Sequence, residues 1–252
     1  MPLRRWYFVG LDPRELIIKE RLKDVRKVIA VVSPKGGVGK TLISTALALI
    51  LSRHNLNIGL LDLDITNPTA HLVLGIDINK LSPKEEKGVI PPIVAGIKFM
   101  TIVYYSKDEA IPLRGHEIVD VIREILAITI WGKLDHLIVD TPPGLSDEVL
   151  EILRLVRPEV LIVTTPSPLS LKSCERLIRL LKDSQVRIIG LVENMSFDMS
   201  TKIIALCNQY NIKYLGRIPF IKDLDNYVSR LEDFIKCKFM EYLKDIVKKI
   251  TL

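Results

Sequence analysis

The sequence lacks the features of a membrane-spanning or secreted chain. No apolar run among its 252 residues reaches the roughly 18 residues that a membrane-spanning helix needs. The chain begins with MPLRRWYFVGLDPREL, which has neither the long apolar stretch nor the small-residue cleavage site of a secretory signal. We therefore expect a cytoplasmic protein.

Cysteine is also scarce. Cys174, Cys207 and Cys237 lie far apart and no CxxC pair occurs, which argues against both a disulfide framework and a zinc site. We interpret the three thiols as buried core side chains. The net charge of +6 is spread along the chain. Because nucleic-acid binding needs a clustered basic patch, this distribution argues against a nucleic-acid partner.

Apolar, β-branched runs alternate with helical patterns along the chain. The runs predict strands at 28–33, 58–64, 97–103, 136–141, 160–166, 186–195 and 214–219. Helices are expected near 40–53, 116–130, 146–155, 170–183, 199–210 and 223–250. This order predicts an α/β fold with a doubly wound, mainly parallel sheet of about seven or eight strands.

The same patterns suggest how the chain is divided. We expect a single domain over 28–252, with 82–92 as an exposed loop because proline and charge are frequent there. Residues 1–27 form an N-terminal lead-in segment. It could be a helix packed on the sheet edge or a partner-binding arm.

A glycine-rich loop, SPKGGVGKT, follows the first strand and precedes the helical pattern LISTALALIL. Glycines let backbone N–H groups turn inward around a polyphosphate, and the helix N-terminus adds the positive end of its dipole. Lys40 would neutralise the β- and γ-phosphates, and Thr41 offers a hydroxyl to Mg²⁺. The predicted phosphate-binding residues are Gly36, Gly37, Val38, Gly39, Lys40 and Thr41.

A second lysine, Lys35, precedes the glycines. The loop thereby resembles that of the deviant P-loop ATPases (MinD, ParA, Mrp and the nitrogenase iron protein), which read KGGxGK[ST] and have the P-loop NTPase (SIMIBI-type) fold. The resemblance implies slow ATP hydrolysis and a homodimer that forms on ATP binding, in which Lys35 reaches the partner's nucleotide. Pro34 stands where many members have glycine. Leu42 replaces a Ser or Thr that contacts the α-phosphate, a loss of about 0.5–1.5 kcal/mol.

Carboxylates follow two of the predicted strands. Asp140 closes HLIVD before TPPG, which resembles the family's Walker B and switch II element, so Asp140 would hold Mg²⁺ through a water and Gly144 would donate its N–H to the γ-phosphate. Asp62 and Asp64 are two residues apart on an extended chain, so both can face the nucleotide. By resemblance, Asp64 orients the attacking water and Asp62 supports the Mg²⁺ shell. Lys35, Lys40 and Asp64 are the predicted catalytic residues.

Resemblance also suggests a base-binding site and a branch of the family. Asn194 stands where the family reads the adenine edge, and Pro219 and Phe220 occupy the loop that flanks the base. DLDITNPTAHLVLGI, WGKLDHLIVDTPPGLSDE and VENMSF resemble the Mrp and Nbp branch. That branch carries iron–sulfur clusters on a CxxC after ENMSxF, whereas this chain reads FDMSTKIIALC. A dimer with one cysteine from each chain at any one site supplies too few thiolates for a cluster.

Three functions therefore compete. The first is a Mrp-like ATPase without cluster ligands that acts on an unidentified client protein in metallocofactor assembly or regulation. The second is a MinD-like switch that docks on membranes through the amphipathic stretch RLEDFIKCKFMEYLKDIVKKI, although its mixed charges and helical spacing favour packing within the domain. The third is ParA-like DNA binding, which the diffuse charge supports poorly.

Overall fold

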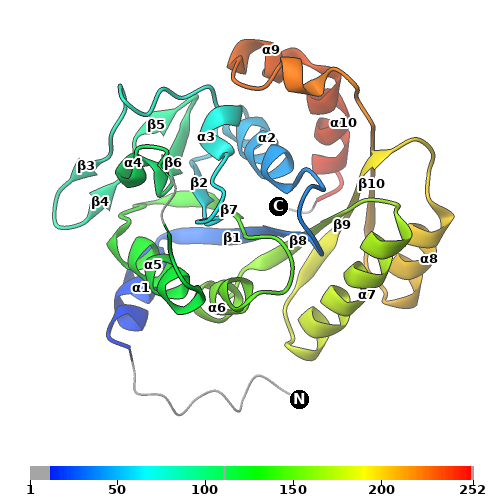
Figure 1. Cartoon of the computed structure of the whole chain (residues 1–252), viewed down its shortest axis with the longest axis horizontal. Helices are drawn as coiled ribbons and strands as arrows, with labels where there is room; N and C mark the ends of the chain where they lie inside the picture. Colours follow the sequence, from blue (N-terminus) through cyan, green and yellow to red (C-terminus); the bar gives the residue numbers. More distant parts are fainter. Residues whose placement is uncertain (1–11, 110–111, 251–252) are drawn as a thin grey trace.

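A mainly parallel sheet forms the centre of the molecule. The structure, a computed structural model, describes residues 12–109 and 112–250. Its eight-stranded sheet has the order β10-β9-β8-β1-β7-β2-β6-β5, and only β5 runs antiparallel to its neighbour (Figure 1). The strands are β1 (Val25–Val32), β2 (Ile58–Asp62), β5 (Ile93–Val94), β6 (Ile97–Met100), β7 (Leu134–Asp140), β8 (Glu159–Thr164), β9 (Ile188–Ser196) and β10 (Tyr214–Pro219). The predicted α/β sheet is confirmed.

Helices cover both faces of this sheet, which explains why its strands are apolar along their length. Figure 1 shows α2 and α10 on one face and α5, α6, α7 and α8 on the other. The longer helices are α2 (Lys40–Ser52), α5 (Gly115–Ile128), α6 (Asp147–Val156), α7 (Pro168–Asp183), α8 (Thr201–Gln209) and α10 (Lys238–Val247). Shorter ones are α3 (Ala70–Val73), α4 (Val103–Ser106), η2 (Leu224–Asn226) and α9 (Leu231–Lys236).

Two expected elements differ in the structure. The single helix predicted over 223–250 is wrong: η2, α9 and α10 replace it, and Cys237 is extended between the last two. This break lets the rings of Phe234 and Phe239 pack 6.0 Å apart, both fully buried. The loop expected at 82–92 contains a short antiparallel hairpin, β3 (Lys84–Glu85) and β4 (Val89–Ile90), because Gly88 takes a φ of +145°.

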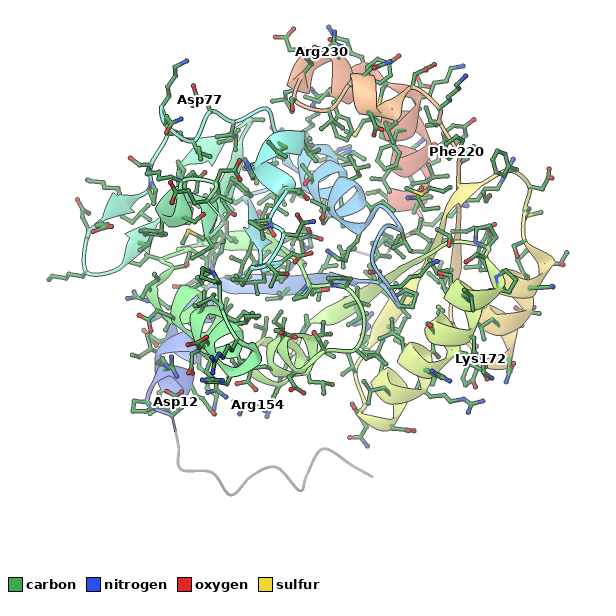
Figure 2. The ribbon with its side chains drawn as sticks, viewed as in Figure 1. Asp12, Asp77, Arg154, Lys172, Phe220 and Arg230 are labelled. Carbon is green, nitrogen blue, oxygen red and sulfur yellow. The ribbon has the colours of Figure 1, made fainter. Side chains whose placement is uncertain are left out.

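The described part of the N-terminal segment forms a helix. Helix α1 (Arg14–Leu22) packs against α5 and α6, away from the sheet edge, and buries Ile18 completely. Ion pairs join it to both neighbours: Arg14 lies 2.9 Å from Asp120, and Arg154 lies 2.9 Å from Glu15. Figure 2 labels Arg154 near α1. Residues 1–11 lie outside the described residues, so a partner-binding role for them stays a prediction.

The sheet topology sets the position of the candidate site. Strands β1, β7 and β2 are neighbours although β7 follows β2 by more than seventy residues in the chain. Parallel neighbours end at the same edge, so the segments after these three strands meet there, at the point where open α/β sheets bind ligands. No helix in the described part of the chain is long and apolar enough to span a bilayer.

Candidate nucleotide-binding site

The phosphate loop, residues 33–39, joins β1 to α2. Gly37 and Gly39 have φ angles of +74° and +81°, the left-handed region that favours glycine. A Cβ atom at Gly39 would lie only 2.3 Å from Nδ2 of Asn194. Gly39 is also the N-cap of α2, so no side chain accepts the first-turn amides of this 13-residue helix. The loop therefore leaves backbone donors and the positive end of the helix dipole open to an anion, and phosphate binding there stays a prediction.

Lys40, Thr41 and Asp140 come together at the start of α2. The Lys40 Nζ atom lies 2.7 Å from Asp140 Oδ1, and the Thr41 hydroxyl donates to Asp140 Oδ2 at 2.7 Å. Lys40 is 6% exposed and Asp140 is fully buried. A buried carboxylate held by one cation and one hydroxyl is well compensated. The phosphate loop and the predicted metal-binding strand end therefore share one polar cluster.

Asp62 and Asp64 lie beside this cluster. Asp62 is the register partner of Asp140 on the adjacent strand, and it accepts the amides of Asp64 at 3.1 Å and Ala70 at 3.2 Å. Burial, reinforced by the negative charge of Asp140, raises the pKa of Asp62 to about 8. Burial also raises the pKa of Asp64, which receives a hydrogen bond from Thr66. Asp62 thus shapes the turn that carries Asp64, in addition to any predicted metal role.

The predicted switch residue contacts the phosphate loop directly. Gly144 has a φ of +82° and donates its amide to the Ser33 carbonyl at 3.0 Å. Thr141 fixes the start of the same segment by donating to the Val31 carbonyl at 2.9 Å. A γ-phosphate contact by Gly144 would therefore require its amide to leave Ser33. That exchange has the form of a two-state switch.

The remaining predicted residues surround the loop at different exposures. Asn194 is buried and donates Nδ2 to the Val38 carbonyl at 2.8 Å, so it braces the phosphate loop. Lys35 is exposed, with Nζ 3.4 Å from Ser167 Oγ. Leu42 is half-buried and packs on the core. Pro219 ends β10, and Phe220 is 51% exposed. The roles of these residues stay predictions.

Similar proteins identify the family of this site. Residues 24–251 match the ParA family, described as a NUBPL iron-transfer P-loop NTPase. The chain belongs to this family. The chain is 33% identical over 266 residues to the iron-sulfur cluster carrier protein of Methanocaldococcus jannaschii, and the match covers 96% of this chain and 89% of that protein. It is 35% identical over 252 residues to the cytosolic Fe-S cluster assembly factor CFD1 of Kluyveromyces lactis, covering 91% and 87%.

Solved structures agree with this assignment. The nucleotide-binding protein in complex with ADP from Archaeoglobus fulgidus superposes with a TM-score of 0.77 at 28% identity, covering 94% of this chain and 97% of that one. MinD complexed with Mg-ADP from Pyrococcus horikoshii superposes with a TM-score of 0.64 at 21% identity, covering 89% and 96%. The latter likeness concerns the fold alone. The predicted resemblance to the MinD, ParA and Mrp superfamily is confirmed.

Sequence reasoning about this ParA-family chain missed one buried acid. Glu193 precedes Asn194 on β9 and is fully buried. Its carboxylate accepts the Tyr214 hydroxyl at 2.8 Å and the Ser200 amide at 3.2 Å, which fixes the segment between β9 and α8. The sequence did contain an indication of this role, because Glu193 stands within an otherwise apolar strand and a glutamate is buried in such a strand only when it has polar partners.

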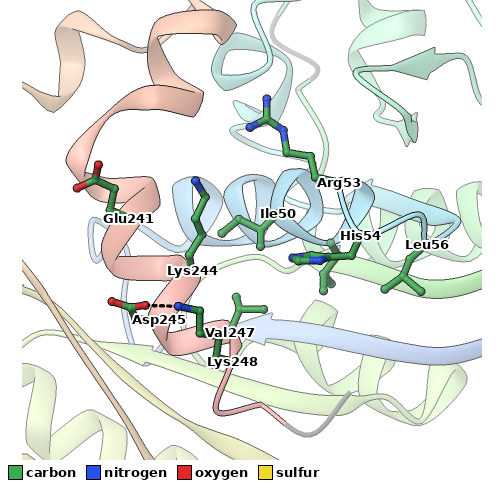
Figure 3. Close-up of a pocket in the computed structure, with 10 residues that line it drawn as sticks. Ile50, Arg53, His54, Leu56, Glu241, Lys244, Asp245, Val247 and Lys248 are labelled. Carbon is green, nitrogen blue, oxygen red and sulfur yellow. Dashed lines mark hydrogen bonds and ion pairs between the residues drawn. The ribbon is translucent and has the colours of Figure 1, made fainter.

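One cavity lies away from the phosphate loop. It has a volume of about 660 Å³ and lies between the C-terminal end of α2 and helix α10 (Figure 3). Ile50 and Val247 contribute apolar surface, while Arg53 and Lys244 contribute cations. Because Lys40 begins α2 and this cavity adjoins its other end, the cavity is no part of the phosphate site.

Proposed function

We propose that this protein is a MgATP-binding, slowly hydrolysing switch that dimerises with ATP and serves iron–sulfur cluster assembly. The main observation that supports this proposal is the cluster of Lys40, Thr41 and Asp140 beside a glycine-rich loop. No side chain accepts the first backbone N–H groups of the helix that follows this loop. Membership in a P-loop NTPase family supports it. The relative from Archaeoglobus fulgidus, described in complex with ADP, supports adenine nucleotides as ligands.

The residues present fit a magnesium ion. Mg²⁺ prefers oxygen donors and is usually held by one or two carboxylates together with substrate phosphates. The Thr41 hydroxyl and the Asp140 carboxylate supply such oxygens, and Asp62 is the register neighbour of Asp140. When bound, the ion neutralises charge on the β- and γ-phosphates.

The chain's own residues would do the rest. The loop amides bind the phosphate oxygens, and Lys40 turns its ammonium group from Asp140 toward the β- and γ-phosphates. Asp64 orients the attacking water and accepts its proton, a role that a raised pKa favours. Lys35 is exposed, and on leaving the Ser167 hydroxyl it would reach a partner's nucleotide. ATP and water would give ADP and phosphate, and Gly144 would respond to loss of the γ-phosphate.

The cysteines do not fit an iron–sulfur cluster held by this chain. Cys174, Cys207 and Cys237 are all buried, on α7, on α8 and between α9 and α10. Burial raises the pKa of Cys174 to about 12 and that of Cys207 to about 11, so thiolates are disfavoured. No group of three or more potential metal ligands gathers anywhere in residues 12–109 or 112–250. We therefore propose that the cluster belongs to a client protein.

The C-terminal helix bears on the membrane alternative. Phe239, Leu243 and Ile246 on α10 are buried, and the helix packs against α2 and β10. Its apolar stripe thus has a partner within the chain, which disfavours a membrane-docking role. A cytoplasmic location is proposed instead, in keeping with the word cytosolic in the name of the Kluyveromyces lactis relative.

Calorimetry with ATP and magnesium tests the nucleotide proposal, with phosphate release as the second readout. We expect saturable binding and slow turnover. Absence of any binding heat would refute the proposal. Anaerobic reconstitution with iron and sulfide, followed by visible absorbance, tests the absence of cluster ligands. A stable, stoichiometric cluster on the purified chain would show that assignment to be wrong.

A further inference from the structure

The direction of the side chains along β9 changes where this strand meets the phosphate loop. In a regular strand, successive side chains point to opposite faces of the sheet. Two neighbours on β9 differ in this way. The Glu193 carboxylate accepts the Tyr214 hydroxyl at 2.8 Å. Asn194 instead donates Nδ2 to the Val38 carbonyl of the phosphate loop at 2.8 Å. Regular alternation would place the next side chain, Met195, on the side of Glu193 and away from the loop.

Met195 interrupts this alternation. Its φ of +56° lies in the left-handed region that residues other than glycine rarely adopt. The pairing of β9 with β10 shifts at the same point: Glu193 pairs with Arg217, and further along Ser196 pairs with Pro219. Two residues of β9 therefore oppose one residue of β10, which is the arrangement of a β-bulge. A bulge redirects the side chains at the point where it forms.

The bulge brings Met195 onto the phosphate loop. A Cβ atom at Gly39 would lie 3.3 Å from Met195 Cε and 2.3 Å from Nδ2 of Asn194. Two successive side chains of β9 therefore end at the same glycine, which regular alternation would not allow. Gly39 is the N-cap of α2, so its position sets the direction of the first amides of that helix.

Packing of the hydrophobic core does not account for the conformation of Met195. The side chain is half-buried and lies outside the apolar core formed by the described residues. A left-handed conformation at a residue other than glycine costs free energy and persists only where its surroundings hold it, and such strain is concentrated at functional sites. Here Asn194 is fixed by its bond to the phosphate loop, and the Ser196 carbonyl accepts the Phe220 amide at 3.1 Å. The strained backbone therefore serves the contact with Gly39.

We propose that Met195 is a positioning residue for the nucleotide, whose thioether methyl group packs on Gly39 and holds the first amides of α2 toward the phosphates. The proposal rests on the proposed ATP-binding function and adds a residue that acts through the phosphate loop. Asn194 holds the carbonyl of Val38, and Met195 holds the next residue by van der Waals contact. An unbranched thioether suits this contact because it adapts to an irregular apolar surface.

Three substitutions of Met195, measured by calorimetry with MgATP and by urea unfolding, separate the side chain from the strained backbone. Glycine accepts a φ of +56° without strain, so Met195→Gly should unfold at the wild-type urea concentration or above it. The same variant should bind ATP roughly 10-fold more weakly, because the contact with Gly39 is lost. Met195→Ala keeps the strain and should lose affinity to a similar extent. Met195→Leu keeps an apolar side chain of similar volume and should stay within about 3-fold of the wild type.

Steady-state phosphate release supplies a readout that a purely structural role would not move. The loop amides contact phosphate both before and during the reaction, so Met195→Gly should raise the KM for ATP roughly 10-fold and leave kcat within about 3-fold. Met199→Ala is the matched control for Met195→Ala, because Met199 is 60% exposed on the segment after β9. Its affinity for ATP should equal that of the wild type.

Weakened ATP binding by Met195→Gly at undiminished stability would support the proposal. Wild-type affinity in this variant would overturn it, because the side chain would then contribute nothing to binding. If the glycine variant does not fold, the leucine and alanine variants decide: a weaker alanine variant would support the proposal, and equal affinities of these two would overturn it. A wild type that binds no nucleotide would instead overturn the proposed function.

Discussion

Lys40→Met tests the central ion pair by two effects of one substitution. The variant keeps much of the apolar stem but leaves Asp140, which is fully buried, with the Thr41 hydroxyl as its remaining side-chain donor. Breaking a buried pair by removing one partner destabilises a protein by about 3–5 kcal/mol. Since Lys40 retains 6% exposure, we expect the lower end of this range, about 3 kcal/mol. For a chain of this length, the midpoint of thermal unfolding should fall by roughly 6–12 °C.

The same variant should lose ATP. Each charge-assisted hydrogen bond contributes about 1.5–3 kcal/mol, and Lys40 is expected to meet two phosphates, so the dissociation constant should rise at least roughly 100-fold. Thermal unfolding followed by circular dichroism measures the first effect, and calorimetry with MgATP measures the second. Lys35→Met is the matched control. Its side chain is exposed, so the stability of that variant should stay within about 0.5 kcal/mol of the wild type.

A double-mutant cycle completes this test. In the Asp140→Asn background, Lys40→Met no longer leaves a buried charge without its cation. The second substitution should therefore cost less by roughly 2 kcal/mol than in the wild type. If Lys40→Met bound ATP normally and unfolded at the wild-type temperature, the phosphate-site assignment would be refuted. If the two substitutions were additive, the ion pair would not be the source of the stability effect.

Three further outcomes are expected. Asp64→Asn should bind MgATP but release phosphate at least roughly 100-fold more slowly, and unchanged turnover would exclude Asp64 as the base. Gly39→Ala should weaken ATP binding and destabilise the fold by about 1–3 kcal/mol, because Gly39 has a φ of +81° and a Cβ atom there would meet Asn194. Gly115→Ala is the control, since a Cβ atom at Gly115 meets open space, and it should have neither effect. Calorimetry measures ATP binding and urea unfolding measures stability for both variants. Arg14→Gln should cost about 0.5–1 kcal/mol near neutral pH. Hydrogen bonds from Arg14 lower the pKa of Asp12 from 3.8 to about 2, so this contribution is complete above about pH 5 and should be lost in urea titrations as pH falls through about 2.

Local chemistry explains why the loop and the strands could be predicted from the sequence. Gly37 and Gly39 take positive φ angles that other residues rarely adopt, so their spacing specifies the bend without any distant contact. The runs that form β1 and β7 are apolar because both faces of the sheet are covered, a pattern visible along the chain.

Other features depend on contacts between distant segments. The helix break at Cys237 has no proline or glycine to announce it, and the helical spacing of apolar residues continues across it. The break accompanies the packing of Phe234 against Phe239 in the core, a tertiary contact that the local sequence does not indicate. The hydrogen bond from Asn194 to Val38 joins residues 156 positions apart. The sequence therefore indicated a base-binding asparagine but not the hydrogen bond that ties it to the phosphate loop.

Two of these contacts between distant segments are hydrogen bonds to carbonyl groups of the phosphate loop. The sequence had indicated a role only for the N–H groups of this loop. The phosphate loop is expected to bind its ligand through N–H groups, yet its carbonyl groups are engaged too: Ser33 accepts the Gly144 amide and Val38 accepts the Asn194 side chain. One bond comes from the switch segment after β7 and the other from the predicted base-binding residue on β9. Because both end on the same short loop, a nucleotide that shifts its backbone must alter both hydrogen bonds. The phosphate loop therefore connects the predicted switch residue after β7 with the predicted base-binding residue on β9, through hydrogen bonds to two of its carbonyl groups.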